Sequence, residues 1–112
     1  MPEGAPITKV ERTKAYGAEV VLSGQGYDDA FRKAQEVQQE KGAVFVHAFD
    51  DPLVIAGQGT IGLEILEELP DLDAVVVPIG GGGLIAGVAC AIKEPQTWGT
   101  IIGVKLGMPL LC

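Results

Sequence analysis

Two stretches in the first half of the chain carry apolar residues at the three- and four-residue spacing of an amphipathic helix. The first begins at Pro6, which is well suited to a first helical position, and ends at Gly17. The second ends at Gly42, and its apolar face consists of Tyr27, Ala30, Phe31, Ala34 and Val37. The pattern therefore predicts two helices, each followed by a short apolar run.

Those apolar runs, Ala18 to Leu22 and Ala43 to Phe49, contain several β-branched residues. Composition of this kind favours strands, so the pattern predicts a strand after each helix. Because helix and strand then alternate along the chain, we expect parallel strands joined by helical crossovers.

A third helix is predicted to end before Pro70. The pair Asp50-Asp51 precedes Pro52, which is the usual order of an N-cap and a proline in the first turn. The apolar side of this helix consists of Ile55, Ile61, Ile65, Leu66 and Leu69. Its interior also holds three glycines that lower helix propensity: Gly57, Gly59 and Gly62. Either another backbone or a cofactor approaches closely there, or the helix is locally irregular.

The last third of the chain is predicted to contain a strand, a glycine run, a helix and a final strand. Residues 73–78 form an almost continuous apolar run, typical of a parallel strand that is covered on both faces. Leu84 to Lys93 is an apolar helix that stops before Pro95, and a strand follows near Thr100 to Val104. The predicted fold class is α/β, a three-layer parallel sheet with flanking helices.

Four consecutive glycines, Gly80 to Gly83, separate the strand from the helix. Each glycine costs roughly 0.5–1 kcal/mol relative to alanine in ordered chain, so the run calls for a compensating gain. A strand-to-helix turn with exposed N–H groups at the positive end of a helix dipole provides one, because it binds phosphate. The alternative is a tight loop with left-handed dihedral angles, for which one or two glycines suffice. Since no Lys-Ser or Lys-Thr follows the loop, main-chain groups would hold the phosphate.

Composition and charge narrow the class of protein. The 112 residues suffice for one domain or a piece of one. A net charge of −7 argues against nucleic acid or an anionic membrane as a partner. With neither a secretory signal nor an apolar run of membrane-spanning length, a cytoplasmic protein is expected.

Few side chains offer catalytic chemistry. His47 is the only histidine, and a structural role is expected because no nucleophile or second ligand stands at a useful spacing. Cys90 and Cys112 lack metal-like spacing, and Cys90 is expected in the core of the last helix. Asp50 and Asp51 are better explained as caps than as paired acids. No catalytic and no metal-binding residue is therefore predicted.

Three blocks of the sequence resemble, in order, the threonine dehydratase and serine racemase family of pyridoxal-phosphate enzymes. Val77 to Leu84 resembles the tetraglycine loop of that family, and Phe49 to Glu64 resembles the segment that leads to it. Met1 to Ile7, with Tyr16 to Val20, is similar to a region earlier still. The agreement of three ordered blocks is far more specific than a glycine run alone.

The resemblance implies a fold, a cofactor and a reaction. The fold would be a fragment spanning parts of the two lobes of a fold-type-II enzyme, with pyridoxal 5′-phosphate as cofactor and an amino acid as substrate. The phosphate would be bound by the backbone N–H groups of Gly80, Gly81, Gly82, Gly83 and Leu84. Phe49 stands where threonine dehydratases carry phenylalanine and serine racemases carry asparagine. That favours a lyase of amino-acid metabolism and isoleucine biosynthesis, which converts L-threonine to 2-oxobutanoate and ammonia; a serine racemase or serine dehydratase is the alternative.

The resemblance also implies that the chain is a fragment and inactive alone. The catalytic lysine of the family lies in a Ser-Phe-Lys segment, a context that none of the present lysines has: Lys9, Lys14, Lys33, Lys41, Lys93 and Lys105. Residues 1–49 would belong to the small lobe and 50–104 to the large lobe, followed by a divergent tail, 105–112. Lys105 stands where some members carry a metal-binding glutamate, and the apolar tail would favour self-association.

A second class of function is compatible with the same residues. The glycine loop would also serve a self-standing phosphate- or nucleotide-binding module without catalysis. Replacing Gly81 and Gly82 by valine should abolish binding of the phosphate ligand in that module.

Overall fold

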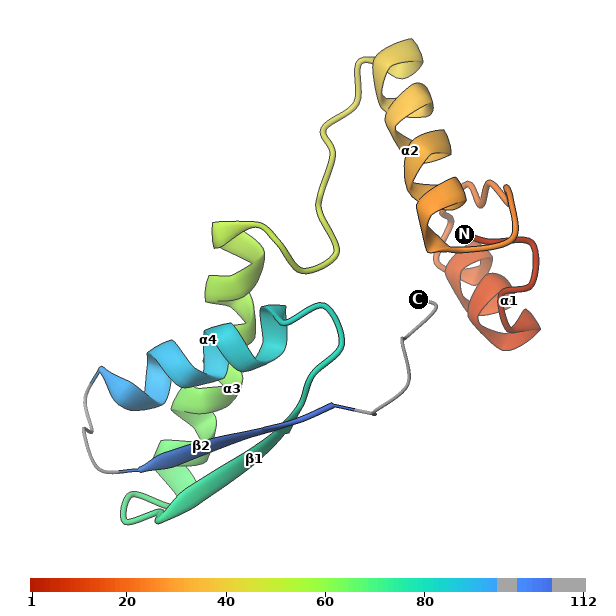
Figure 1. Ribbon diagram of the computed structural model, residues 1–112. Helices are drawn as coiled ribbons and strands as arrows, with labels where there is room; N and C mark the ends of the chain where they lie inside the picture. The colour runs from red at the N-terminus through yellow and green to blue at the C-terminus, as the bar shows by residue number, and fades with distance from the viewer. Residues whose placement is uncertain (95–98, 106–112) are drawn as a thin grey trace. The chain divides into compact units, whose positions relative to one another are not determined.

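The computed structural model describes residues 1–94 and 99–105 of the chain (Figure 1). The elements within this part follow the order α1 (Ile7–Ala15), α2 (Tyr27–Lys41), α3 (Pro52–Glu68), β1 (Ala74–Pro78), α4 (Gly83–Lys93) and β2 (Thr100–Val104). The described residues divide into two compact units, one formed by residues 1–45 and one by residues 46–94 with 99–105. The predicted α/β class with a parallel sheet is confirmed. The divergent tail lies outside the described residues, apart from Lys105.

The first unit contains α1 and α2, and both helices end where glycines were predicted to end them. Gly17 and Gly42 adopt the left-handed conformation, with φ of 81° and 60°, which side chains rarely tolerate. At the other end of α2, the Asp29 carboxylate accepts hydrogen bonds from the backbone N–H groups of Gln25 (3.0 Å) and Gly26 (3.4 Å). Sequence therefore determines both ends of α2 directly.

The prediction of strands at Ala18–Leu22 and Ala43–Phe49 is wrong, because both segments are irregular. A segment with strand propensity forms a strand only when a neighbouring strand accepts and donates its backbone hydrogen bonds. Within the described residues neither segment has such a neighbour. The Val21 carbonyl instead accepts a hydrogen bond from the amino group of Met1 at 2.8 Å.

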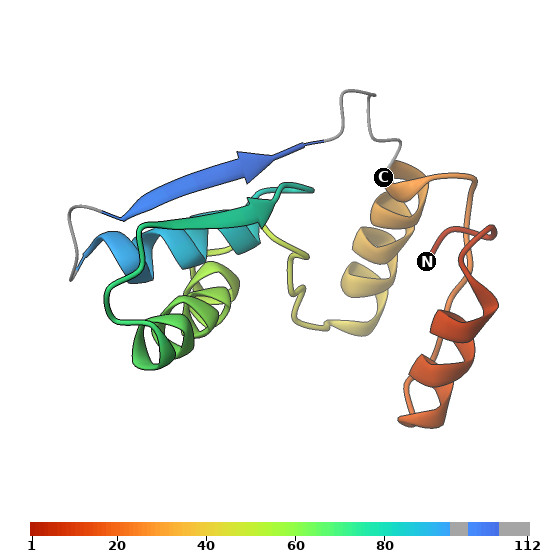
Figure 2. The ribbon, with the colours of Figure 1, turned by 90° about the horizontal axis from the view of Figure 1, so that it is seen from below.

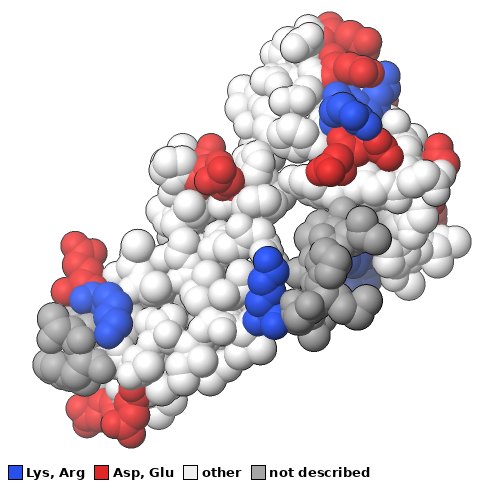
Figure 3. Space-filling view, in the orientation of Figure 1, with Lys and Arg blue, Asp and Glu red and all other residues white. Residues whose placement is uncertain are grey.

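The second unit contains a two-stranded parallel sheet with β1 paired to β2, from Ala74 opposite Thr100 to Pro78 opposite Val104. Figure 2 shows α3 and α4 together on one side of the strands. The face toward these helices is apolar, with Val77 only 4% exposed. On the other face Val76 and Ile102 are 62% and 44% exposed, so within the described residues the helices cover one side of the sheet. The space-filling view shows a largely uncharged surface over this unit (Figure 3).

Helices α3 and α4 cross at very close range, as Figure 1 shows. A Cβ atom at Gly87 of α4 would lie 2.6 Å from the backbone nitrogen of Gly59 and would also overlap the Ile55 carbonyl. A Cβ at Gly62 would lie 3.0 Å from the Val88 carbonyl oxygen. Two of the three helical glycines are thus explained by backbone approach, whereas a Cβ at Gly57 would meet nothing within 4 Å.

The core beneath this crossing fixes the direction in which α4 leaves the sheet. It consists of Leu72, Val77, Val88 and Ile92, with Ile65 and Leu66 of α3 packed against it. Cys90 was expected in this core, but it is exposed. Because α4 is apolar on every side, its sequence carries no periodicity that distinguishes the covered face from the open one. No helix of the described residues combines the length and the apolar character needed to cross a membrane.

Candidate functional site

The glycine run lies where β1 ends and α4 begins. The Ile79 N–H donates to the Val104 carbonyl at 2.8 Å, which continues the β1–β2 ladder to the edge of the loop. Gly82 is the N-cap of α4, with φ of 97°, and its carbonyl accepts from the Ala86 N–H at 3.0 Å. Both ends of the loop are therefore held by regular structure, and its left-handed step requires glycine.

The backbone N–H groups of the loop have no acceptor in the part of the chain that the structure describes. From Gly80 to Leu84, none of them donates a hydrogen bond to a group within residues 1–94 or 99–105. Orphan N–H groups are normal in the first turn of a helix, and they are satisfied by caps, water or ligands. Here they stand at the positive end of the α4 dipole, where an anion is stabilised.

A recess of about 390 Å³ opens beside these N–H groups. Its lining consists of Ala48, Phe49, Gln58, Pro78 and the five residues Gly80, Gly81, Gly82, Gly83 and Leu84. All of them belong to the second unit. No charged side chain is among these described lining residues, so the recess offers main-chain dipoles and one amide side chain, that of Gln58.

Phe49 forms the support of the loop. A Cβ at Gly81 would overlap the Phe49 ring, and a Cβ at Gly83 would lie 2.7 Å from the Phe49 carbonyl oxygen. At Gly80 and Gly82, by contrast, a Cβ would meet nothing within 4 Å. Two glycines are thus required for contact with Phe49, and the other two border open space where a ligand group fits.

The segment before α3 is held by two side chains with structural roles. The Nδ1 atom of His47 accepts hydrogen bonds from the backbone N–H groups of Phe49 (3.2 Å) and Asp50 (2.8 Å). Asp51 caps α3 by accepting from the N–H groups of Leu53 (2.8 Å) and Val54 (3.3 Å). The structural interpretation of His47 is confirmed, and the capping interpretation is confirmed for Asp51, whereas the N-cap of α3 is not Asp50. No group of three or more His, Cys, Asp or Glu side chains within the described ranges is arranged to hold a metal ion.

All five predicted cofactor-binding residues line one recess, but sequence reasoning missed Gln58 as a member of it. Gln58 lies on α3, between Gly57 and Gly59. Its nearness to the loop depends on the close crossing of α3 and α4, which the glycine at position 59 permits. The glycine spacing was a signal of that crossing, but it did not indicate which polar side chain would reach the loop.

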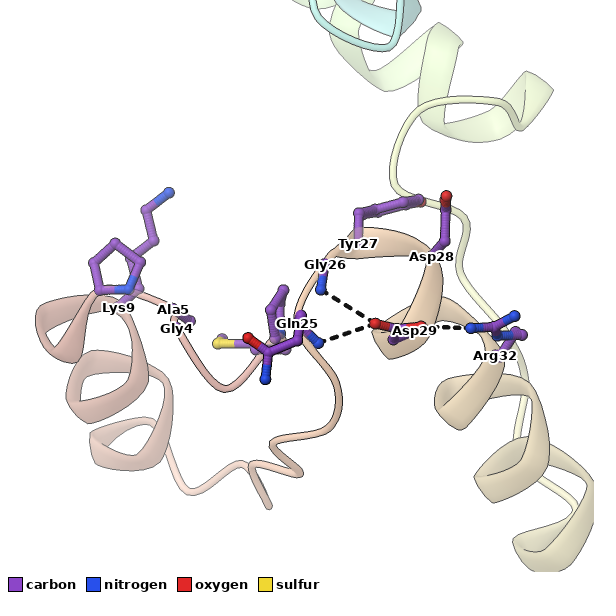
Figure 4. A pocket seen from close by; sticks show the side chains of 12 residues that line it. Gly4, Ala5, Lys9, Gln25, Gly26, Tyr27, Asp28, Asp29 and Arg32 are labelled. Carbon is purple, nitrogen blue, oxygen red and sulfur yellow. Dashed lines mark hydrogen bonds and ion pairs between the residues drawn. The ribbon is translucent and has the colours of Figure 1, made fainter. Parts of the chain in front are cut away.

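A second recess, of about 1020 Å³, lies within the first unit (Figure 4). Asp29 and Arg32 line it and form an ion pair with each other. The Gln25 N–H, the Arg32 guanidinium and the Gly26 N–H together hold the pKa of the Asp29 carboxyl below its ordinary value. These polar groups already satisfy one another, so they define the start of α2 rather than a site poised for chemistry.

Comparison with known proteins identifies the family of the chain. The profile of the family described as "Pyridoxal-phosphate dependent enzyme" matches residues 1–109. The L-threonine ammonia-lyase of Geobacter sulfurreducens is 61% identical over 105 residues, which cover 94% of this chain and 26% of that protein. The chain therefore spans only about a quarter of the length of that relative.

Solved structures give the same result. The processed form of threonine deaminase isoform 2 from Solanum lycopersicum superposes with a TM-score of 0.86 at 46% identity, covering 96% of this chain and 31% of that one. Maize serine racemase superposes with a TM-score of 0.86 at 41% identity, covering 91% of this chain and 31% of that one. On the profile match and these likenesses, the chain belongs to the family of pyridoxal-phosphate-dependent enzymes, of fold type II.

Proposed function

We propose that this chain is part of an L-threonine ammonia-lyase, and that Gly80, Gly81, Gly82, Gly83 and Leu84 hold the phosphate of its pyridoxal 5′-phosphate. The observation that carries the proposal is the row of backbone N–H groups without an acceptor in the described residues, at the N-terminus of α4. The identity of 61% to the Geobacter sulfurreducens enzyme supports the reaction.

The residues present fit the phosphate end of this cofactor. A phosphate carries strong acceptor oxygens, and the loop offers donors with no competing carboxylate in the lining of the recess. The open space at Gly80 and Gly82 gives such a group room, whereas the Phe49 ring closes the other side of the loop.

Within the proposed enzyme, this chain contributes binding and orientation. Pyridoxal phosphate, when bound, supplies the electron sink for loss of the α-proton and the β-hydroxyl group of L-threonine, giving 2-oxobutanoate and ammonia. The loop fixes the phosphate, and the Gln58 amide adds a neutral hydrogen-bonding group beside it. A role in isoleucine biosynthesis and a cytoplasmic location are parts of the same proposal.

The 112 residues are proposed to be inactive by themselves. No lysine lines the recess in the described part of the chain. Lys14, Lys33 and Lys41 lie in the first unit, where they pair with Glu11, Glu36 and Glu19. We also propose that residues 1–49 belong to the small lobe and residues 50–104, with the phosphate loop, to the large lobe. Self-association through exposed apolar surface is a further part of the proposal.

Phe49 favours a threonine dehydratase over a serine racemase. Its ring fills the space beside Gly81, so the conformation of the loop depends on the residue at position 49. An asparagine at this position, as the resemblance gives for racemases, would present a smaller and polar group there.

Binding of pyridoxine 5′-phosphate tests the proposal, because this probe keeps the phosphate and the ring but cannot form an imine with lysine. Calorimetry should detect binding to the wild-type chain, and Gly82→Val should abolish it because φ there is 97°. Gly57→Ala is the matched control, since a Cβ at position 57 meets nothing within 4 Å. Equal loss in both variants, or binding by Gly82→Val, would contradict a role of the loop.

Inactivity is tested separately with pyridoxal phosphate, borohydride and L-threonine. We expect neither a stoichiometric adduct at one lysine nor release of 2-oxobutanoate. Turnover of threonine by the purified chain would show that a lysine of this chain serves as the anchor. A nucleotide or inorganic phosphate can also be titrated against the chain. If either binds as tightly as pyridoxine 5′-phosphate, the result would instead favour the self-standing binding module.

A further inference from the structure

His47 makes contacts that a surface histidine does not need. Its Nδ1 atom accepts two backbone N–H groups, those of Phe49 at 3.2 Å and Asp50 at 2.8 Å. A ring nitrogen that accepts hydrogen bonds does so through its lone pair, so the Nδ1 lone pair of His47 points at these two N–H groups. The side chain of His47 thus holds the backbone of residues 47–50 in a turn.

The same turn fixes the orientation of Phe49. The His47 and Phe49 rings meet edge to face, with centroids 4.8 Å apart and planes inclined at 83°. Such a pair restricts both rings, since aromatic rings at this distance prefer edge-to-face or offset-stacked geometry to a face-to-face sandwich. His47 therefore acts on Phe49 twice, through its backbone N–H and through its ring.

Phe49 in turn determines where the glycine loop can lie. Its ring occupies the position that a Cβ at Gly81 would take, and its carbonyl oxygen would lie 2.7 Å from a Cβ at Gly83. A rotation of Phe49 would either push the loop outward or leave a gap beneath it. Either change would move the backbone N–H groups of Gly80–Leu84. His47 itself is not among the residues that line the recess.

We propose that His47 is a positioning residue of the phosphate site: by accepting the Phe49 and Asp50 N–H groups at Nδ1, it holds Phe49 under the glycine loop and so sets the affinity for the phosphate ester. This inference rests on the proposed function, which assigns the loop to phosphate. It adds a residue that is not among the lining residues of the recess and that contacts the loop's support, Phe49.

Two substitutions separate the acceptor of His47 from its ring. His47→Asn keeps an acceptor, because the asparagine Oδ1 stands at the same bond distance from the backbone as Nδ1. His47→Phe keeps an aromatic ring against Phe49 but has no acceptor. The proposal expects His47→Phe to weaken binding of pyridoxine 5′-phosphate by about tenfold, the effect of leaving N–H donors unpaired, and His47→Asn to remain within about threefold of wild type.

A readout without ligand keeps this test independent of the proposed function. Hydrogen exchange of the Ile79 and Ala86 amides, which are hydrogen-bonded at the two ends of the glycine loop, should be faster in ligand-free His47→Phe and close to wild type in His47→Asn. If wild type binds no pyridoxine phosphate, the proposed function fails, and the exchange rates alone decide the role of His47. Wild-type exchange in His47→Phe, or equal acceleration in both variants with the helix content unchanged, would overturn the proposal.

Discussion

The Phe49 ring lies so close to the backbone of Gly81 that a Cβ at position 81 would overlap the ring. This contact joins the segment before α3 to the loop before α4, two parts of the chain that are more than thirty residues apart in sequence. It explains why glycine is required on the covered side of the loop, as well as at the left-handed step of Gly82. The loop is therefore shaped from below by an aromatic ring and left open on its other side.

Phe49→Ala should remove the support of the loop and weaken phosphate binding. The half-buried ring should also contribute to stability, so we expect a loss of about 1–2 kcal/mol in the free energy of unfolding, less than for a fully buried phenylalanine. Urea unfolding measures the stability, and titration with pyridoxine 5′-phosphate measures the affinity. Phe49→Leu, which keeps apolar volume, should lose less of both; an alanine variant with wild-type affinity would show that the loop needs no support.

Gly87→Ala tests the crossing of α3 and α4. Its Cβ would overlap the Ile55 carbonyl and lie 2.6 Å from the Gly59 nitrogen, so the helices must separate. We expect destabilisation of about 3 kcal/mol or more, in the range of severe overpacking. Thermal unfolding followed by circular dichroism provides the measurement.

The control for Gly87→Ala lies on the facing helix. Gly57→Ala introduces the same methyl group into open space and should raise stability by up to about 1 kcal/mol through helix propensity. Similar melting temperatures for the two variants would mean that the helices do not cross at Gly87.

Asp51→Ala should destabilise α3 by about 0.5–2 kcal/mol, because two N–H groups of its first turn lose their acceptor. Asp50 is the matched control: it has the same charge one position earlier, and α3 is capped by Asp51 rather than by Asp50. Equal effects of Asp50→Ala and Asp51→Ala in urea unfolding would attribute the loss to charge and not to capping.

The start of α2 should depend on pH through Asp29. The Gln25 N–H, the Arg32 guanidinium and the Gly26 N–H lower the pKa of this carboxyl in the folded chain. A group with a lowered pKa contributes stability that is present above its ordinary pKa and is lost as the pH falls through the folded value. Helicity should therefore decrease under acidic conditions in wild type, and this component should vanish in Asp29→Asn. A decrease of the same size in Asp29→Asn would assign the acid sensitivity to other carboxyl groups.

Local signals in the sequence predicted the ends of the helices well, because their causes lie within a few residues. Gly42 ends α2 and Asp51 with Pro52 begins α3 through backbone geometry that any context would preserve. The expected strands at Ala18–Leu22 and Ala43–Phe49 failed for the opposite reason, since a strand needs a partner that its own residues do not specify.

The candidate site shows the same division. The glycine run and its position between β1 and α4 were evident from the sequence. That Phe49 lies under Gly81, and that Gln58 reaches the recess, depends on how α3 crosses α4. Cys90 was misplaced because a helix that is apolar all round does not indicate which side the sheet covers.

The most direct test of the account is a titration of the ¹⁵N-labelled chain with pyridoxine 5′-phosphate, followed by amide chemical shifts. We predict that the largest shifts fall on Gly80, Gly81, Gly82, Gly83 and Leu84, the N–H groups that find no acceptor among the described residues. Shifts confined to the first unit, for example around Gln25 and Arg32, or no shifts at saturating probe, would contradict the assignment of the glycine loop to phosphate.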